Sequence, residues 1–371
     1  MGTSPNSVAV GDFNGDGTPD LVVANIGDQT TPGTVSVLIN KQNGTFKSAV
    51  NYPAGSAPYS VAVGDFDGDG KPDLAVADNG SGTVTVLLNA GGSFPSPIPY
   101  PVGMNPTSVA VGDFNGDGSP DLAVANYGDG TVSVLLNVGP TIPSPPGSPP
   151  NGSPGNGGPP LGSFLPGITI PVSINNPWSV VVGDFNSDGW PDLAVANHNS
   201  TMVSVLLNPG PGISGNPAIG VPHAGGVYSL GAADISAFSL AVGDFNGDGM
   251  LDLAAATVVS TVSVLLNAGS GSFGSAGTYL AGGTPFSLAV GDFNGDGKPD
   301  LAMSIASYGT GKVSVLLNAG SGGFVAGGTY DASSRPTAVA AGDFNGDRKL
   351  DLAVVNQSGN TVSVLLNDCV P

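Results

Sequence analysis

Residues 11–20 read Gly11-Asp12-Phe13-Asn14-Gly15-Asp16-Gly17-Thr18-Pro19-Asp20, and the chain repeats this stretch along its whole length. Six further copies have their first aspartate at positions 65, 113, 184, 244, 292 and 343. A short apolar run precedes each copy, and two more apolar runs follow it. Repetition at a period near 50 residues indicates an architecture of equivalent units, so the repeat decides the fold.

Each copy places oxygen-bearing side chains at positions 1, 3, 5 and 9 of a tight loop. Hard cations such as Ca²⁺ take six to eight oxygen ligands, including backbone carbonyls and water. Alternate positions on a curled loop point inward, so positions 1, 3 and 5 can converge on one ion. The carbonyl of position 7 can then face the ion and position 9 can close the shell, while a glycine at position 6 permits the left-handed turn. The sequence therefore predicts six or seven bound Ca²⁺ ions.

The predicted ligands share these five loop positions. They are Asp12, Asn14, Asp16, Thr18 and Asp20; Asp65, Asp67, Asp69, Lys71 and Asp73; Asp113, Asn115, Asp117, Ser119 and Asp121; Asp184, Asn186, Asp188, Trp190 and Asp192; Asp244, Asn246, Asp248, Met250 and Asp252; Asp292, Asn294, Asp296, Lys298 and Asp300; Asp343, Asn345, Asp347, Lys349 and Asp351. The residue at position 7 is expected to contribute only its carbonyl.

Two other interpretations of the loop are weaker. An EF-hand begins in the same way but needs a glutamate at position 12, where the first copy has Val23, and the chain contains no glutamate. An ordinary turn also favours Asp, Asn and Gly, yet seven copies that keep all four oxygens favour a metal site. The charge agrees, because 22 of the 28 acidic residues lie in these loops, in a chain of net charge −20.

The composition limits the remaining possibilities. We interpret residues 1–371 as one domain, although the length would allow two. The single cysteine, Cys369, excludes an internal disulfide framework. No apolar stretch reaches the ~18–20 residues of a membrane-spanning helix, and nothing indicates nucleic-acid binding. Weak Ca²⁺ sites suit the outside of a cell, so we expect an extracellular protein, although Met1 opens directly into repeat sequence without a signal peptide.

Each unit is predicted to form four antiparallel strands. The first two apolar runs suit strands covered on both faces, the third is β-branched, and an aromatic segment such as residues 271–279 forms an outer fourth strand. Four strands at this period indicate a β-propeller blade, and seven blades close a ring. A Pro/Gly-rich insert at residues 139–163 lengthens the third unit, and residues 209–237 lengthen the fourth.

The seventh unit differs from the others. Its third run is Val362-Ser363-Val364-Leu365-Leu366, and no aromatic fourth segment follows. We expect a three-stranded blade with an open edge, which is a template for pairing with another chain. Self-association through this edge is one possible consequence.

The repeated Asp-Phe-Asn-Gly-Asp-Gly-x-Pro-Asp motif resembles the FG-GAP/VCBS repeats of integrin α-subunit propellers and of many bacterial secreted proteins. The resemblance implies an all-β, seven-bladed propeller whose Ca²⁺ loops join the first and second strands of each blade on one face. It also implies a partner on the opposite face. Two loops depart from the pattern: Arg348 replaces the glycine at position 6 of the seventh loop, which should bind Ca²⁺ most weakly, and the fourth has Ser187 at position 4 and Trp190 at position 7.

The sequence does not predict an enzyme. We interpret His198 and His223 as surface histidines and Cys369 as incidental. Aromatic and histidine side chains are expected on the face opposite the Ca²⁺ loops, at Tyr59, Tyr127, Trp178, His198, Phe238, Phe286 and Tyr308. Three functions are open: an extracellular Ca²⁺-binding adhesion or protein-interaction module; a carbohydrate-binding lectin or accessory domain of a polysaccharide-degrading enzyme; and a self-assembling structural subunit. The ligand of the opposite face is accordingly a protein or a glycan.

Overall fold

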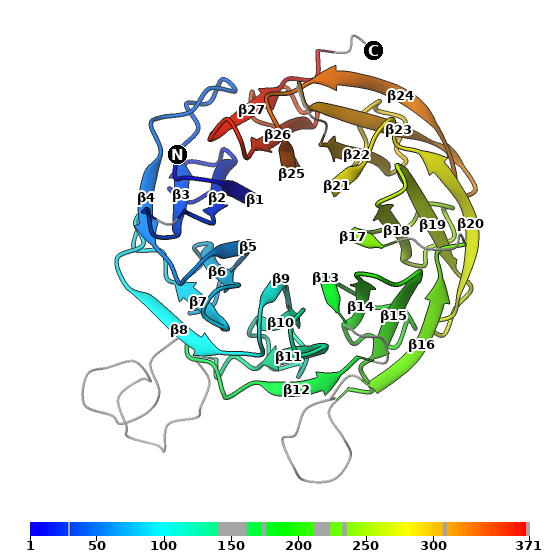
Figure 1. The fold of residues 1–371 in the computed structure, drawn as a ribbon, viewed down its shortest axis with the longest axis horizontal. Helices are drawn as coiled ribbons and strands as arrows, with labels where there is room; N and C mark the ends of the chain where they lie inside the picture. The colour runs from blue at the N-terminus through cyan, green and yellow to red at the C-terminus, as the bar shows by residue number, and fades with distance from the viewer. Residues whose placement is uncertain are drawn as a thin grey trace.

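The computed structural model describes residues 1–28, 30–139, 162–172, 176–210, 223–231, 236–306 and 310–368. Within these ranges the chain forms 27 strands and no helix. The strands gather in seven antiparallel sheets arranged around a central axis (Figure 1). The predicted seven-bladed β-propeller is confirmed. No helix within the described ranges is long and apolar enough to cross a membrane.

The first four blades each contain four strands in chain order. Blade one comprises β1 (Pro5–Gly11), β2 (Asp20–Asn25), β3 (Thr34–Leu38) and β4 (Val50–Pro53). Blade two comprises β5 (Pro58–Gly64), β6 (Asp73–Asp78), β7 (Thr83–Leu87) and β8 (Pro97–Pro101). Blade three comprises β9 (Pro106–Gly112), β10 (Asp121–Asn126), β11 (Thr131–Leu135) and β12 (Ile168–Pro171). Blade four comprises β13 (Pro177–Gly183), β14 (Asp192–Asn197), β15 (Met202–Leu207) and β16 (His223–Ser229).

The last three blades continue the order, and only the final one is incomplete. Blade five comprises β17 (Ala237–Gly243), β18 (Asp252–Thr257), β19 (Thr261–Asn267) and β20 (Phe273–Leu280). Blade six comprises β21 (Pro285–Gly291), β22 (Asp300–Ile305), β23 (Lys312–Gly320) and β24 (Gly323–Asp331). Blade seven comprises β25 (Pro336–Gly342), β26 (Asp351–Asn356) and β27 (Thr361–Leu365), and so has the three strands that the sequence predicts.

The first and second strands differ in burial. Every residue of each second strand is buried, as in β2 and β6, because another blade packs on each side. The first strands are mostly half-buried, as in β1 and β5, because they are the innermost strands and border the central channel (Figure 1). The prediction of strands covered on both faces is therefore right for the second strands and wrong for the first.

The hydrophobic core is divided among the junctions between blades. One cluster joins Phe13 and Val35 of blade one to Leu74 and Phe94 of blade two, and another joins blades seven and one. Burial of apolar area is the main favourable contribution to folding, and here nearly every core residue has neighbours from two blades. Each blade therefore depends on the blades on either side of it.

A ring of serines joins the innermost strands around the channel. The Ser7 Oγ accepts a 3.3 Å hydrogen bond from the Val61 backbone N–H of the next blade. Equivalent bonds of 3.2–3.3 Å use the hydroxyl oxygens of Ser60, Ser108, Ser179, Ser239 and Ser287. Blade seven has Ala338 at this position, so the ring is open between the last blade and the first.

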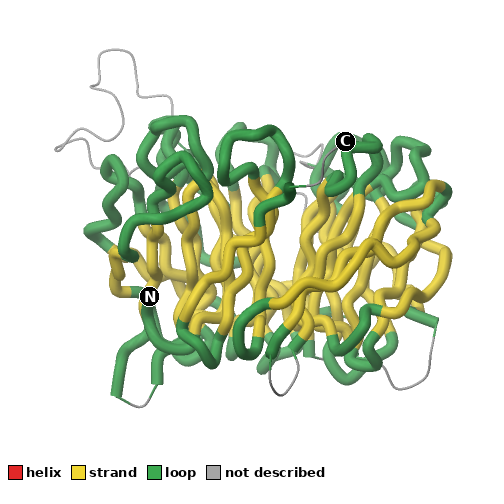
Figure 2. Tube along the Cα trace, turned by 90° about the horizontal axis from the view of Figure 1, so that it is seen from above, coloured by secondary structure: helices red, strands yellow, loops and turns green. Residues whose placement is uncertain are grey.

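Connections gather on two opposite faces of the ring, with the strands between them (Figure 2). All blades have the same strand order, so the seven loops between first and second strands lie on one face. The turns between second and third strands lie on the other face. This arrangement separates the predicted metal loops from the predicted aromatic surface.

Candidate metal centres

The aspartate at position 1 organises each loop through backbone hydrogen bonds. Asp12 accepts from the Asp16 N–H at Oδ1 (3.0 Å) and from the Gly17 N–H at Oδ2 (2.8 Å). The position-5 and position-6 amides bind the position-1 carboxylate in the same way in the other six loops. The carboxylate is therefore fixed inside the curl by its own backbone.

Positions 3 and 5 complete the curl. The Asn14 Oδ1 accepts from the Asp16 N–H at 2.9 Å, and the Asp16 Oδ1 accepts from the Thr18 N–H at 3.0 Å. Both bonds recur in all seven loops. These bonds hold the side chains of positions 1, 3 and 5 against the backbone of the same curl, although in the second loop only positions 1, 3 and 9 bring their carboxylates together.

Two positions of the loop have left-handed backbone, although the sequence pointed to only one. Gly17 at position 6 has φ 84°, as expected, and Gly15 at position 4 has φ 74°. In the fourth loop Ser187 occupies position 4 with φ 59°. In the seventh loop Arg348 has φ 69°, and its N–H still donates to the Asp343 Oδ2 at 2.8 Å. The arginine therefore preserves the loop at the cost of a conformation that L-residues disfavour.

The aspartate at position 9 is buried and has a structural role as well. Asp20 accepts the Phe13 N–H at Oδ2 (3.0 Å) and the Asn40 N–H at Oδ1 (2.8 Å), so it ties the loop to the end of the third strand. All seven loops contain this pair of bonds. Burial raises the pKa of these carboxyl groups, to about 7 for Asp121 and to about 6 for Asp73.

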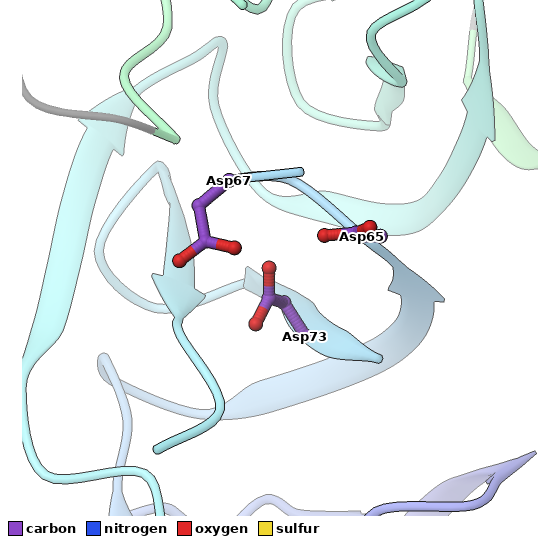
Figure 3. Close-up of side chains that lie close together, drawn as sticks. All are labelled: Asp65, Asp67 and Asp73. Carbon is purple, nitrogen blue, oxygen red and sulfur yellow. The ribbon is translucent and has the colours of Figure 1, made fainter. Parts of the chain in front are cut away.

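The second loop has the densest group of carboxylates. Asp65, Asp67 and Asp73 each offer an oxygen, and these atoms lie within 4.8 Å of one another. Figure 3 shows the three carboxyl groups pointing toward a common centre. The other loops have asparagine in place of Asp67, so their inward-facing oxygens carry one negative charge fewer. The spacing of these oxygens fits a hard divalent cation.

Lysines at position 7 form ion pairs that the sequence analysis did not predict. Lys71 bonds to Asp69, and the Lys298 Nζ lies 2.8 Å from the Asp296 Oδ2. Both pairs lie on the exposed outer side of the loop, where ion pairs contribute little to stability. Trp190, at the same position of the fourth loop, lies against Gly116 of the preceding loop and Gly210 of its own blade.

A side-chain hydrogen bond from an asparagine, repeated in all seven blades and called here the asparagine clasp, joins each loop to the next blade. The Asn89 side chain of blade two donates to the carbonyl oxygen of Phe13 in blade one at 3.0 Å, while its own N–H donates to Asp73 at 2.7 Å. The equivalent asparagines are Asn40, Asn137, Asn208, Asn267, Asn318 and Asn367. Sequence reasoning missed this role, although an asparagine at the end of every third apolar run was a visible signal. Each metal loop is consequently coupled to a junction between blades.

The opposite face carries a continuous aromatic cluster, which we call the channel-mouth cluster. It comprises Tyr59, Tyr127, Trp178, His198, Phe238 and Phe286. Trp178 is central, with ring centroids 5.7 Å from Tyr59, 5.5 Å from Tyr127 and 5.0 Å from His198. A pocket of about 150 Å³ opens beside the cluster, among the starts of the first strands of all seven blades. Six of the seven predicted side chains of this face therefore lie together, and Tyr308 lies outside the described residues.

His198 is not the plain surface residue that the sequence suggested. Its ring packs against Trp178 and Phe238, and its Nδ1 is buried with no hydrogen-bond partner among the residues that the structure describes. Desolvation lowers the pKa of this imidazole, so the neutral form is favoured. The side chain of His223 and the whole of Cys369 lie outside the described residues.

Family profiles match most of the chain. An FG-GAP-like repeat profile matches residues 12–76, 65–124, 113–195, 244–303 and 304–354, and an FG-GAP repeat profile matches residues 176–217. The comparison with curated protein sequences returned no match.

Similar solved structures share the fold at low sequence identity. BBS1N, crystallised in complex with ARL6DN, is 15% identical with a TM-score of 0.63, covering 99% of this chain and 94% of that one. A protein from Lactobacillus plantarum is 13% identical with a TM-score of 0.60, covering 90% and 86%. The hydrazine synthase of Kuenenia stuttgartiensis is 15% identical with a TM-score of 0.60, covering 100% and 98%. At these identities the likeness concerns the fold alone.

Proposed function

This chain belongs to the FG-GAP repeat family, whose propeller fold suggests a protein-interaction module, and we propose that it is an extracellular adhesion or interaction module that binds Ca²⁺. FG-GAP repeats are typical of extracellular proteins, which supports the location. We propose no catalytic activity. The observation that carries the calcium proposal is the curl with the same hydrogen bonds in all seven loops, which in the second loop brings three carboxylates within 4.8 Å of one another.

Electrostatics supports the role of Ca²⁺. Each loop holds three or four carboxylates within one tight curl, and like charges at this distance repel. The position-9 carboxylate is held by two backbone amides and the position-1 carboxylate by at least two, so the loop has little freedom to separate the charges. A divalent cation would remove the repulsion without rearranging the backbone.

Thermal unfolding in Ca²⁺ and in excess chelator tests this proposal. If free Ca²⁺ is ten times Kd, each site contributes roughly 1.4 kcal/mol, and six or seven sites give on the order of 8–10 kcal/mol. We expect a large fall in Tm in chelator, and metal analysis after dialysis should count six or seven ions. An unchanged Tm would remove calcium from the proposal.

The channel-mouth cluster is the proposed partner surface. Aromatic side chains are enriched at binding hot spots, and six of them lie together here on the face away from the metal loops. The BBS1N propeller was solved in complex with another protein, ARL6DN, which is consistent with a partner-binding propeller. We expect Trp178→Ala to remove partner binding while leaving Ca²⁺ stabilisation unchanged.

A glycan is the second candidate ligand, because aromatic rings can stack on sugars and the rings of this cluster are half-buried. Binding on a glycan array that Trp178→Ala abolishes would favour the lectin function over the protein-interaction function. Leu280→Ala, on the outer strand of blade five, is a suitable control because this exposed residue lies in a different part of the ring. Self-association through blade seven is the third candidate, and the shape of that edge bears on it.

A further inference from the structure

An aromatic pair repeats at the outer side of the junctions between blades. The segment that leads into the outer strand of blade two contains Phe94, whose ring meets Phe13 of the metal loop of blade one edge-on at 5.9 Å. The same pairing joins Phe164 to Phe66, Phe273 to Phe185, Phe324 to Phe245 and Phe46 to Phe344, at 5.5–5.8 Å. In five of the six four-stranded blades, a phenylalanine next to the outer strand thus packs on the phenylalanine at position 2 of the predicted metal loop of the preceding blade.

A tyrosine from the neighbouring outer strand completes four of these five contacts, all except that of Phe46 with Phe344. Tyr52 lies 5.4 Å from Phe94, edge-on, and its hydroxyl donates to the Gly92 carbonyl oxygen at 3.4 Å. Tyr100, Tyr228 and Tyr279 make the equivalent ring contacts and hydrogen bonds with the following blade. The inserted segment is therefore recognised through both its phenylalanine ring and a backbone carbonyl.

The segment always reads Gly-x-Phe, and the glycine has a steric reason. Gly44, Gly92, Gly162, Gly271 and Gly322 all have positive φ between 69° and 88°. A Cβ on Gly271 would lie 2.7 Å from Leu207, and one on Gly322 would lie 2.9 Å from Leu266, both leucines of the preceding blade. At Gly271 and Gly322 any other residue would therefore meet both backbone strain and a collision, whereas at Gly92 only the strain opposes it.

In the part of the chain that the structure describes, blade seven has no fourth strand and therefore no such segment, so the aromatic site that blade six would offer to it is open. Phe293 and Tyr330 occupy the two aromatic positions, but neither has a ring partner among the described residues. Phe293 is 9% exposed, whereas its equivalent Phe13 is 1% exposed, and Tyr330 is 46% exposed. Both line a groove of about 410 Å³ that also includes Leu317, the equivalent of Leu207 and Leu266, and Leu366.

We propose that this groove binds a linear, extended segment of another polypeptide that carries the sequence Gly-x-Phe-x₅-Tyr. The Phe ring would lie between Phe293 and Tyr330, and the Gly would lie against Leu317. The segment would add to β27 as a fourth, antiparallel strand, a known mode of peptide recognition. This binding site is distinct from the channel-mouth cluster and needs no metal ion.

The register of the added strand follows from the complete blades. Asn318 pairs with Phe324 and Val313 with Tyr330 in blade six, and blade five has the same pairs at Asn267–Phe273 and Val262–Tyr279. In blade seven the equivalent positions are Asn367 and Val362. The bound Phe should therefore pair with Asn367 and the bound Tyr with Val362, where it can contact Phe46 of blade one.

The shape of the groove favours a single strand over a second copy of this chain. In Figure 1 β24 runs along the outer rim beside β27, and on the other side Gly44 lies against Leu366. The open edge of β27 thus has a neighbour on each side, β24 with Tyr330 and the turn at Gly44. Pairing β27 with β27 of a second copy would bring these flanking segments of the two copies together, whereas a single strand would lie between them.

A synthetic peptide of residues 271–281, which reads Gly-Ser-Phe-Gly-Ser-Ala-Gly-Thr-Tyr-Leu-Ala, tests the proposal. Fluorescence anisotropy with the full chain should show saturable one-to-one binding. Replacing the peptide Phe by Ala should weaken binding at least tenfold, and replacing its first Gly by Ala should weaken it similarly. The protein variant Tyr330→Ala should weaken binding several-fold, whereas Leu280→Ala should leave it unchanged.

Several outcomes would overturn this inference. One is that the peptide does not bind. Another is that the Phe→Ala peptide binds as tightly as the original peptide. A third is that Leu280→Ala weakens peptide binding as much as Tyr330→Ala does. Self-association of the free protein that Tyr330→Ala abolishes would assign the groove to a second copy instead. Tyr330 is half exposed, so its replacement should not prevent folding, and an unchanged far-ultraviolet spectrum would verify that. Anisotropy measured in chelator, at a temperature below the Tm found there, separates this site from the calcium proposal.

Discussion

The Asn40 side chain donates a 2.9 Å hydrogen bond to the carbonyl oxygen of Phe344, across 304 residues of sequence. This bond joins the first blade to the last and so closes the ring. The same Phe344 oxygen also accepts the Gly44 N–H at 2.8 Å. The serine ring is interrupted at this junction, where the Ser4 N–H also donates to the Asn360 Oδ1 at 2.8 Å and the Thr337 hydroxyl to the Pro5 carbonyl oxygen at 3.3 Å.

Asn40→Ala should destabilise the closed ring. The change removes the donor to Phe344 and to the Pro19 carbonyl oxygen, both at 2.9–3.0 Å. The Phe344 oxygen keeps the Gly44 N–H as a donor, so the cost is that of losing two hydrogen bonds, about 1–2 kcal/mol. Urea unfolding should show this decrease, and Lys41→Ala, at an exposed residue of the adjacent turn, should show almost none. Equal effects of the two substitutions would contradict the assigned role of the clasp.

Ala338→Ser should strengthen the same closure. Ser287, the equivalent residue of blade six, accepts the Val339 N–H at 3.3 Å, and a serine at 338 would face the Val8 N–H of blade one. A new hydrogen bond contributes about 0.5–1.5 kcal/mol. Ser287→Ala is the matched opposite change and should lose a similar amount in the same unfolding assay. Destabilisation by Ala338→Ser would mean that the nearly buried site has no room for the hydroxyl.

The fold was predictable because its information is local and repeated. Each unit contains its own strands and turns, and seven units determine the number of blades. Three strands were expected in the seventh blade because its third apolar run, which begins at Val362, is not followed by the aromatic segment that forms the fourth strand of the other units. The half-burial of the first strands was missed because an apolar run alone does not distinguish a strand that borders a channel from one between two sheets.

The candidate site was predictable within a loop and much less so between loops. Asp12, Asn14 and Asp16 are close in sequence, and the structure brings them together. The Asn89–Phe13 clasp spans two blades, so only the ring geometry reveals it. His198 was misinterpreted for the same reason, since its contacts with Trp178 and Phe238 come from other strands. The ions themselves stay a prediction.

Asp78→Asn should change the pH dependence of stability. Asp78 ends β6 and accepts hydrogen bonds from the Thr85 Oγ1 (2.6 Å) and the Gly55 N–H (3.1 Å), and burial raises its pKa to about 6. Below pH ~4 the carboxyl is protonated in both states and has no effect. Between pH ~4 and 6 the unfolded state ionises first, so the free energy of unfolding falls as pH rises. The raised pKa of Asp78 corresponds to a loss of roughly 2–3 kcal/mol in the free energy of unfolding at neutral pH.

Blade three provides the matched control for this change. Asn126 occupies the equivalent position, accepts the Gly103 N–H at 3.2 Å and donates to the Ser133 Oγ at 2.9 Å. Asp78→Asn should therefore stabilise the protein above pH 6 and have little effect at pH 4, and Asn126→Asp should do the reverse. Urea unfolding across this pH range measures both. A difference that does not vary with pH would contradict the assignment to the Asp78 carboxyl.

Arg348→Gly should strengthen Ca²⁺ binding by the seventh loop. A unit positive charge about 6 Å from a divalent ion in water-like surroundings costs about 1.4 kcal/mol, or about tenfold in affinity. The glycine also relieves the left-handed backbone strain at φ 69°, which amounts to about 1–2 kcal/mol. The greater conformational entropy of glycine in the unfolded chain offsets part of this gain in stability. Two causes therefore act in the same direction and must be separated.

Ser187→Gly separates them, because Ser187 has a similar φ of 59° in the fourth loop but carries no charge. In chelator both substitutions should raise the free energy of unfolding by about 1 kcal/mol or less, since both relieve backbone strain. In calorimetric titration only Arg348→Gly should gain affinity through charge, and that gain should shrink at high salt because exposed charges are screened. Equal gains from the two substitutions at low salt would show that strain, and not the guanidinium charge, weakens the seventh loop.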